Sequence, residues 1–576
     1  MEEKKKNLKN IIECLIKSFF ATFAVMGITD LETTNIFLLC IFVASFVLFG
    51  LRKKHIEQPE KRVFVPGIVL AALFSILYAL FSDLSGGLEN AAFRMIYSGS
   101  CILGLFVIFF EAIVSLLWFF SEKDELFKKE EKRPFSLKTL FLYTGIILVC
   151  MIPFLLLNFP AVMTPDSISQ YRQITGSLPL KNHHPWIHTL TFGLFYKLGF
   201  AVTQNEISAI AFYTVFQMIT ISVSVGYAIE CLYEAGIKKG FRIAALLMFV
   251  LYPYNLIYSV TIWKDILFSV AVLVLTVTVF RVLEKWTLRD KIIFVISALG
   301  MCLYRFNGFY AFIVVLLLLL IIKRKEIKNY LIYGVGVLAM VLLINGPIAD
   351  AVGVQKTSFA FAMTIPLQQI GNVVATGGEL TQQQRDFLNE INDVELMGEL
   401  YEPQCEDPLL DWATERDEYY LDSCKGEFIL EWIKIGLNNP GKYIEAFLNQ
   451  TRGYWAPMSP GQTVFFGVME PNAAGLEGAP VLSGPIAVKF NELMTKIYTM
   501  VPIYGIFYSM GSCFWLMLIG GAICISRKEE KKLTVFLPVF LITCTVLAAA
   551  PLVSDLRYQY PLMISLPYLL FISFAV

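Results

Sequence analysis

Charge is scarce in this 576-residue chain, and the charge that is present is balanced. Lys and Arg number 47, Asp and Glu also number 47, and together they make up 16% of the residues, against 56% hydrophobic residues. Soluble domains carry more charge and less apolar content, so this composition excludes them and indicates a polytopic membrane protein. The lack of net charge and of a polybasic arm also excludes an electrostatic partner such as nucleic acid.

Repeats and low-complexity tracts are lacking as well, and the basic and apolar N-terminal stretch shows no cleavage site of a secretory signal peptide. We therefore expect the first apolar run to stay as an uncleaved helix. Of the eleven cysteines, only Cys405 and Cys424 lie outside the apolar runs. For these two a disulfide and two free thiols are both open alternatives.

Long apolar runs, in contrast, are abundant. A hydrocarbon core of about 30 Å needs about 20 helical residues at about 1.5 Å per residue. Fourteen runs approach this length, at residues 11–28, 35–51, 63–81, 96–120, 139–157, 205–232, 241–260, 263–283, 291–305, 308–322, 330–349, 497–526, 534–553 and 558–576. The first contains Glu13 and Lys17, and the ninth is short and ends in Arg305, so either could lie in the interface instead. The prediction is an all-α bundle of about fourteen transmembrane helices.

Basic residues in the loops predict the orientation of these helices. Lys and Arg gather in every second loop, as in residues 52–54, 323–325 and 527–532. Because positive residues stay in the cytoplasm, the alternation predicts a multi-pass protein of the cell membrane with both termini cytoplasmic. The intervening loops are then extracytoplasmic.

Four regions follow from this map: an N-terminal four-helix membrane module (1–135), a transmembrane core (136–349) with a first large extracytoplasmic loop (158–204), an extracytoplasmic segment (350–497) and C-terminal transmembrane helices (498–576). Within the extracytoplasmic segment, residues 426–437 and 442–452 have the spacing of amphipathic helices, joined by a turn at 438–441. We expect this mainly helical segment to lie over the site as a lid or acceptor clamp.

Histidine is rare, so its placement is informative. Three of the four histidines, His183, His184 and His188, fall within six positions, in a cluster that begins fewer than twenty residues after Asp166. Ionisable groups that flank membrane spans are functional candidates by default. The alternative for Asp166 is a helix-start residue that the helix dipole favours, with Thr164 as the cap. For the histidines, phosphate or acceptor binding competes with a divalent metal held by Asp166, His184 and His188.

Further polar residues at span ends are predicted to share the face of Asp166. They are Lys264, Asp265, Arg305, Asn307, Asp555 and Arg557. Their convergence predicts a polar cavity in which Arg557 binds a phosphate with both prongs of its guanidinium and Asp555 orients Arg557. A carboxylate base beside phosphate-binding cations is what transfer from a lipid-phosphate donor requires. A local Lys264–Asp265 ion pair and a snorkelling Arg305 remain the plainer alternatives.

Several segments resemble known proteins. The early acidic loop, the late acid-x-Arg-Tyr element at 555–558 and the many spans look like the GT-C superfamily of polyprenyl-phosphate-sugar glycosyltransferases. A closer similarity, over about residues 139–576, is to a family of uncharacterised bacterial membrane proteins. It is carried by TPDSISQ at 164–170, NHHPWIHT at 182–189, WKDILF at 263–268 and NPGKYIEAFLNQTRGYW at 439–455.

The resemblance implies an inverting glycosyltransferase with a GT-C-like bundle. It would move a sugar from a polyprenyl-phosphate donor to an extracytoplasmic glycan or lipid acceptor of the cell envelope, with Asp166 as general base. The residues implied for the donor phosphate are Arg557, Arg305, Lys264 and His183, and those for the acceptor or for support are His184, His188, Gln170, Asp265, Asp555 and Tyr558. Metal-dependent members pair two acids where this chain has one, so no cofactor is assigned and a divalent metal stays open.

Two other classes of function fit the same features. One is a flippase or transporter of a lipid-linked glycan, which would also have many spans and charges at the membrane edge. The other is a polysaccharide polymerase or ligase that uses a pyrophosphate-linked donor. The donor separates the three classes, because a monophosphate-linked sugar, a pyrophosphate-linked glycan or nothing at all is consumed.

Overall fold

The computed structural model describes residues 2–56, 59–122, 130–131, 133–457, 461, 467–500, 504–549, 552–553 and 555–574. These residues form helices joined by loops, with isolated β-bridges and no β-strand among them. Within the described part of the chain, nine helical stretches are long and apolar enough to cross a membrane. The protein is thus all-helical and has the spans of a membrane protein, as the composition predicted.

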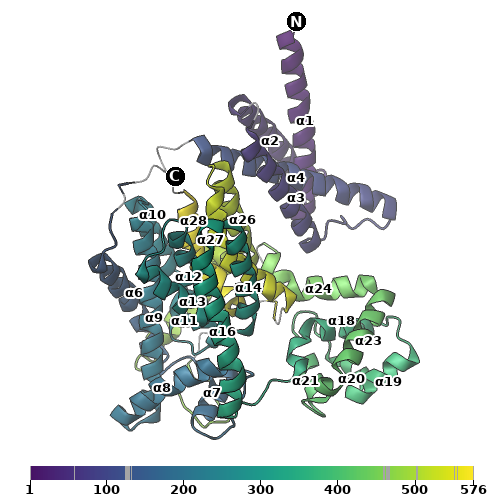
Figure 1. Ribbon diagram of the computed structural model, residues 1–576. Helices are drawn as coiled ribbons and strands as arrows, with labels where there is room; N and C mark the ends of the chain where they lie inside the picture. The colour runs from purple at the N-terminus through teal and green to yellow at the C-terminus, as the bar shows by residue number, and fades with distance from the viewer. Residues whose placement is uncertain are drawn as a thin grey trace.

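The first four helices form a module of their own, in purple in Figure 1: α1 (Glu2–Thr29), α2 (Ile36–His55), α3 (Lys61–Phe81) and α4 (Ala91–Glu122). All four count among the nine candidate spans. The module packs on the rest of the chain through α3 and α4, and the rings of Phe74 and Trp515 stack there at 3.9 Å between centroids. The contact is apolar, as expected between helices of a membrane protein.

Charged side chains inside this module are paired. Lys17 lies 2.6 Å from Glu13 and 2.8 Å from Glu111, and Arg52 lies 3.0 Å from the same Glu111. Lys53 pairs with Glu13 from the other side. Because ionised groups in a membrane are costly unless paired, this network explains how α1 keeps a continuous helix across the two charges that interrupt its apolar run.

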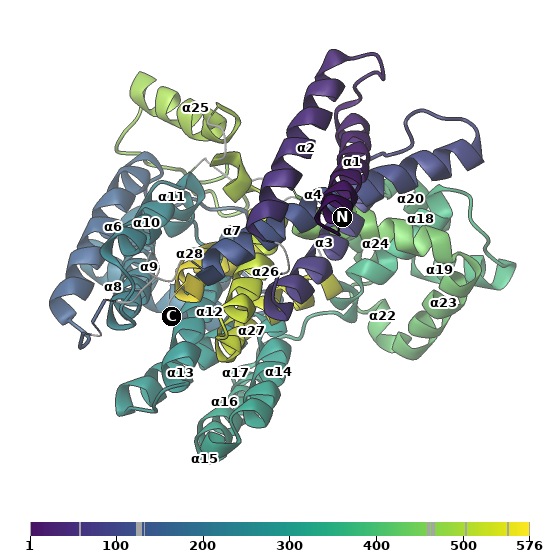
Figure 2. The same cartoon turned by 90° about the horizontal axis from the view of Figure 1, so that it is seen from above.

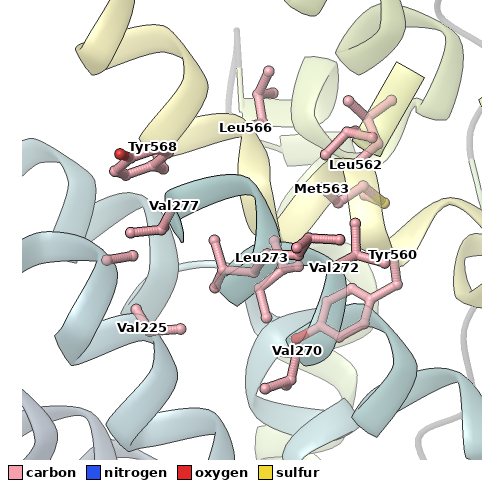
Figure 3. Close-up of a cluster of buried hydrophobic side chains, with 14 of the residues drawn as sticks. Val225, Val270, Val272, Leu273, Val277, Tyr560, Leu562, Met563, Leu566 and Tyr568 are labelled. Carbon is pink, nitrogen blue, oxygen red and sulfur yellow. The ribbon is translucent and has the colours of Figure 1, made fainter. Parts of the chain in front are cut away.

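The core bundle surrounds helices α9, α12 and α28, whose valine, leucine and aromatic side chains interlock in Figure 3. Its helices are α6 (Leu137–Leu157), α9 (Glu206–Glu234), α10 (Lys239–Val250), α11 (Pro253–Ser259), α12 (Lys264–Val282), α13 (Leu288–Tyr304), α14 (Phe306–Ile322), a continuous stretch of η1 (Arg324–Glu326), α15 (Ile327–Asn329), η2 (Tyr330–Val335), α16 (Gly336–Leu343), η3 (Ile344–Ile348) and α17 (Ala349–Val352), then η5 (Tyr504–Tyr508), α26 (Met510–Ser526), η6 (Glu530–Lys532), α27 (Leu533–Ala548), η7 (Leu556–Gln559) and α28 (Tyr560–Phe574).

Five of the fourteen predicted spans contain shorter helices. Residues 291–305, 308–322, 497–526 and 558–576 hold α13, α14, α26 and α28, of 15 to 17 residues each. Residues 241–260 were predicted as one helix, and this is wrong: α10 ends at Val250 and α11 starts at Pro253. Proline lacks an N–H and disfavours helical geometry in the preceding residue, so Tyr252 is extended and the helix breaks there.

A separate helical unit, green in Figure 1, follows the core. It comprises η4 (Phe359–Ala362), α18 (Thr364–Ala375), α19 (Gln382–Ile391), α20 (Val394–Leu400), α21 (Asp407–Thr414), α22 (Tyr420–Ser423), α23 (Lys425–Asn438) and α24 (Pro440–Trp455). The two predicted amphipathic helices are confirmed as α23 and α24. The unit has its own apolar core, and Cys405 and Cys424 are free thiols in it.

Three further helices lie at the edges of the bundle. Helices α7 (Pro165–Ile174) and α8 (Trp186–Thr203) lie together at the lower end of Figure 1, away from the marked chain ends. Helix α25 (Pro485–Met500) lies at the periphery, as the view from above shows (Figure 2), and Phe490 packs on Phe154 of α6. The histidine cluster begins in the loop between α7 and α8.

Candidate functional site

Short β-bridges place the segment that enters α7. Val162 pairs with the stretch before α12, since Val162 N–H donates to the carbonyl of Val260 at 2.8 Å and Ile262 N–H donates back at 3.0 Å. Met163 pairs with residues 467–469 on its other side, through bonds of 3.1 and 3.0 Å. The starts of α7 and α12 therefore lie side by side although about 100 residues separate them in sequence.

The start of α7 is capped as the sequence predicted. Thr164 occupies the N-cap position and forms a capping box with Ser167, and its hydroxyl also accepts a 2.7 Å hydrogen bond from the indole of Trp263. The Ser167 hydroxyl accepts from the Thr164 N–H at 3.2 Å and donates to the Ile262 carbonyl at 2.6 Å. These bonds join both helix starts and hold Asp166 in the first turn of α7.

Asp166 is the centre of an ion-pair cluster. Arg557 Nη1 lies 3.1 Å and Lys264 Nζ 3.4 Å from Asp166 Oδ2. Both contacts fall on Oδ2, and Oδ1 accepts no hydrogen bond from any residue that the structure describes. Burial alone would raise the pKa of this carboxyl, but the Lys264 ammonium and the Arg557 guanidinium outweigh it and hold the pKa well below its ordinary range. Asp166 is therefore ionised at every physiological pH.

Arg557 is held from several directions. Its Nε lies 2.8 Å from Asp555 Oδ2, its Nη2 donates to the Tyr558 hydroxyl at 2.8 Å, and its guanidinium covers the Trp263 ring at 4.9 Å. Asp555 also caps the short helix that carries Arg557, accepting from its N–H at 3.0 Å. Asp555 thus makes the contact with Arg557 that its predicted orienting role requires. The guanidinium is a rigid fork directed at Asp166.

Lys264 links Asp166 to the histidines. Its ammonium donates to His184 Nδ1 at 3.1 Å. Burial and Lys264 lower the pKa of His184 well below its ordinary value, so this imidazole is neutral at pH 7 and keeps the proton on Nε2. His183 lies further out, exposed, with its ring 4.5 Å from that of His184 and 4.3 Å from that of Phe361. Neutral imidazoles here contribute hydrogen bonds and no positive charge.

His188 is in contact with other partners. It is fully buried, Gln170 donates to its Nδ1 at 3.0 Å, and its Nε2 lies 2.8 Å from the Tyr213 hydroxyl. Both ring nitrogens are thus occupied by protein groups, and the residue joins α8 to α7 and α9. The sequence placed His184 at the cap of this helix, whereas α8 begins one residue later than expected, at Trp186 with Pro185 in the cap position.

The residues proposed as metal ligands do not fit a metal. His188 has no nitrogen left for one, and the carboxylate oxygen of Asp166 faces two cations, which would repel a third. Among the described residues, no group of three His, Cys, Asp or Glu side chains could hold an ion.

Asp265 and Arg305 form a second pair beside the cluster. Arg305 Nη1 lies 2.6 Å from Asp265 Oδ1, and Asp265 is 1% exposed. The local Lys264–Asp265 pair considered from the sequence is absent from the described contacts, because the two neighbours point to different partners. Arg305 meets the cluster through Tyr558, whose ring it covers at 5.0 Å. The contacts of the described residues include none between Arg305 and Asp166.

The outer helical unit closes on the cluster. Val553 N–H donates to the carbonyl of Gln404 at 3.3 Å, and the Tyr454 hydroxyl of α24 donates to the Leu552 carbonyl. Gly453 makes this approach possible, since a Cβ there would lie 1.6 Å from the Val553 carbonyl oxygen. Leu552 and Val553, shortly before Arg557, are thus held between α24 and residues 404–405 of the outer unit.

Glu406 lies in the outer unit directly before α21, and it is not among the residues predicted from the sequence. It is 4% exposed, and burial raises its pKa to about 8, although the nearby Arg557 opposes the rise. Burial likewise raises the pKa of Asp407, against the pull of Arg557. Only the adjacency of two acids before Pro408 marks them in a segment that is acidic throughout.

Comparison with known proteins identifies the family. Residues 168–575, well over half of the chain, match DUF6020, a family of unknown function. The chain belongs to this family. No curated protein and no solved structure matches it. The matched part of this DUF6020 protein begins two residues after Asp166 and includes Lys264, Glu406 and Arg557, while the N-terminal module lies outside it.

Proposed function

We propose that this DUF6020 protein is an inverting glycosyltransferase that moves a sugar from a polyprenyl-phosphate donor to an acceptor hydroxyl on the extracytoplasmic side. The observation that carries the proposal is the contact of one carboxylate, Asp166, with two cations, Arg557 and Lys264, that come from distant parts of the chain. A base and a phosphate site must be adjacent for such a transfer, because the bond to the phosphate breaks as the acceptor loses its proton.

In the reaction, the acceptor oxygen attacks the anomeric carbon while the bond from that carbon to the donor phosphate breaks. The lipid phosphate leaves with the electron pair, and the acceptor proton passes to Asp166. The oxygen suited to accept it is Oδ1, since Oδ2 is engaged by both cations. Inversion follows from a single displacement on the face opposite the leaving phosphate.

A carboxylate with a strongly lowered pKa is a weak base, and the donor corrects this. A phosphate that binds Arg557 and Lys264 neutralises the two cations that lower the pKa of Asp166. The pKa then rises toward the range in which a carboxylate can take a proton. The ion pairs keep the base inactive until the donor is bound.

Other side chains support the phosphate. Neutral His184 orients the Lys264 ammonium, and Asp555 with Tyr558 fixes the plane of the Arg557 fork. Glu406, protonated at neutral pH because its pKa is raised, is a hydrogen-bond donor for a donor or acceptor oxygen. The outer unit that carries it then serves as the acceptor clamp.

The test is to supply the purified full chain with polyprenyl-phosphate-linked and polyprenyl-pyrophosphate-linked sugars and to analyse the lipid products by mass spectrometry. Release of polyprenyl phosphate that depends on an acceptor supports the proposal. Release of polyprenyl pyrophosphate from the pyrophosphate-linked donor supports a polymerase or ligase instead. Movement of the intact lipid between leaflets without consumption of either donor refutes an enzyme and supports a flippase.

A further inference from the structure

A cavity of about 440 Å³ lies between the N-terminal module and the core. No residue of the ion-pair cluster lines it. Helix α3 forms one wall, and α26 and α27 form the other. Its lining is apolar except for Lys61 and Arg62, which stand side by side at the start of α3. The volume lies in the range of about 300–1,000 Å³ that is typical of ligand pockets.

The three helices line this cavity with the parts that lie toward one end of the bundle. The lining of α3 runs from Lys61 to Leu70, a rise of about 14 Å at about 1.5 Å per residue. Helix α26 contributes its last residues, 517–525, and α27 its first, 533–540. Since about 14 Å is half of a hydrocarbon core of about 30 Å, the cavity occupies the depth of one leaflet. Its cationic end adjoins the chain's basic 527–532 loop.

The position of the cavity separates it from the candidate active site. Helix α27 lines the cavity with its first half and leads, beyond Ala548, to the loop that carries Arg557. The ion-pair cluster therefore lies past the opposite end of the same helix. A lipid in this cavity would have its headgroup at the other membrane face from a donor phosphate held by Arg557.

We propose that this cavity binds one anionic glycerophospholipid, with phosphatidylglycerol as the representative headgroup. An acyl chain fills the apolar part, and the phosphate pairs with Lys61 and Arg62. The Glu60 carboxylate lies 2.9 Å from Nε of Arg62, which leaves Nη1 and Nη2 to face the phosphate, and Lys61 is exposed. Held in this way, the lipid fastens the N-terminal module to the core that the family match covers.

Native mass spectrometry of the purified full chain, reconstituted with phosphatidylglycerol or phosphatidylcholine, tests the proposal. We expect one phosphatidylglycerol to survive the removal of bulk lipid, with phosphatidylcholine lost. A surface cation attracts an anionic lipid by a factor of about five, so Lys61→Gln with Arg62→Gln should weaken phosphatidylglycerol binding about thirtyfold. The matched control is Arg324→Gln with Lys325→Gln, an exposed basic pair before another span, which should change nothing.

A second variant fills the cavity without altering charge. Gly521 lines it, and a Cβ there would meet only the Leu533 side chain, at 3.5 Å, which is an ordinary contact. Gly521→Leu should therefore fold and lose the lipid. If it fails to fold, the charge pair decides, because Lys61 and Arg62 are not buried. Equal retention of both lipids by the wild type, or equal losses in the charge pair and its control, would overturn the proposal, as would a wild type that retains no lipid.

Discussion

Replacing Asp166 by Asn separates a general base from a helix-capping or purely ion-pairing residue. The amide has nearly the shape of the carboxylate, so no cavity opens, and Asn suits a helix start about as well as Asp. The change removes one negative charge and the proton acceptor Oδ1, while Asp555 continues to hold Arg557 and His184 continues to hold Lys264.

The cost to stability is small. Asp166 takes part in two ion pairs with its side chain 28% exposed, and partly exposed pairs contribute about 0.2–1 kcal/mol each. We expect the free energy of unfolding to fall by about 0.5–2 kcal/mol. Neither cation is left without an acidic or imidazole partner, so the larger penalty of an orphaned buried charge does not apply.

Donor binding and turnover should change in opposite directions. The carboxylate competes with the donor phosphate for the same cations, and two like charges about 4 Å apart repel by about 1 kcal/mol even in water. Asp166→Asn should therefore bind the donor at least about fivefold more tightly. Loss of a general base lowers turnover by about 10²- to 10⁴-fold. Partial unfolding would weaken both properties together, so the pattern is diagnostic.

The assay measures donor affinity by titration and sugar transfer by product analysis, on the same preparations and with thermal unfolding as a check. Asp350→Asn is the matched control, since Asp350 is an exposed carboxylate in α17, at the end of the continuous helical stretch that starts at Arg324. It should behave as the wild type. Near-normal turnover in Asp166→Asn would return the residue to a capping role, and donor binding weaker than wild type would refute the competition between carboxylate and phosphate.

Three further changes test the surroundings of the site. Arg557→Lys should weaken donor binding about tenfold or more, because an ammonium cannot replace a two-pronged fork; unchanged titration curves would contradict this. Burial stabilises protonated Glu406, so the stability that it contributes is full below about pH 4.3 and is lost as the pH rises through about 8; Glu406→Gln should flatten that part of the stability profile, measured by thermal unfolding from pH 5 to pH 9. Gly453→Ala should cost several kcal/mol, since its Cβ would overlap the Val553 carbonyl oxygen, whereas Gly441→Ala, with open space around it, is the control; equal melting temperatures for the two would refute the close approach of α24.

Much of the helical architecture was predictable from the sequence, because apolar runs of membrane length leave few other structures. The amphipathic spacing of residues 426–437 and 442–452 likewise predicted two helices, and both formed. The break at Pro253 was missed, although the proline is visible in the sequence, because an apolar run conceals it. In each case the deciding forces are local, acting within one or two helical turns.

The grouping of the charged residues was decided by the tertiary structure alone. Two neighbours in the sequence pair with different partners: Lys264 contacts Asp166, and Asp265 contacts Arg305. This happens because the two side chains leave α12 on different faces. Glu406 gains its raised pKa only from the packing of the outer unit on the loop before Arg557. The composition determined that charges are few, and the positions of the apolar runs placed these charges at helix ends. Which of them meet depends on how distant helices pack, and no local pattern encodes that.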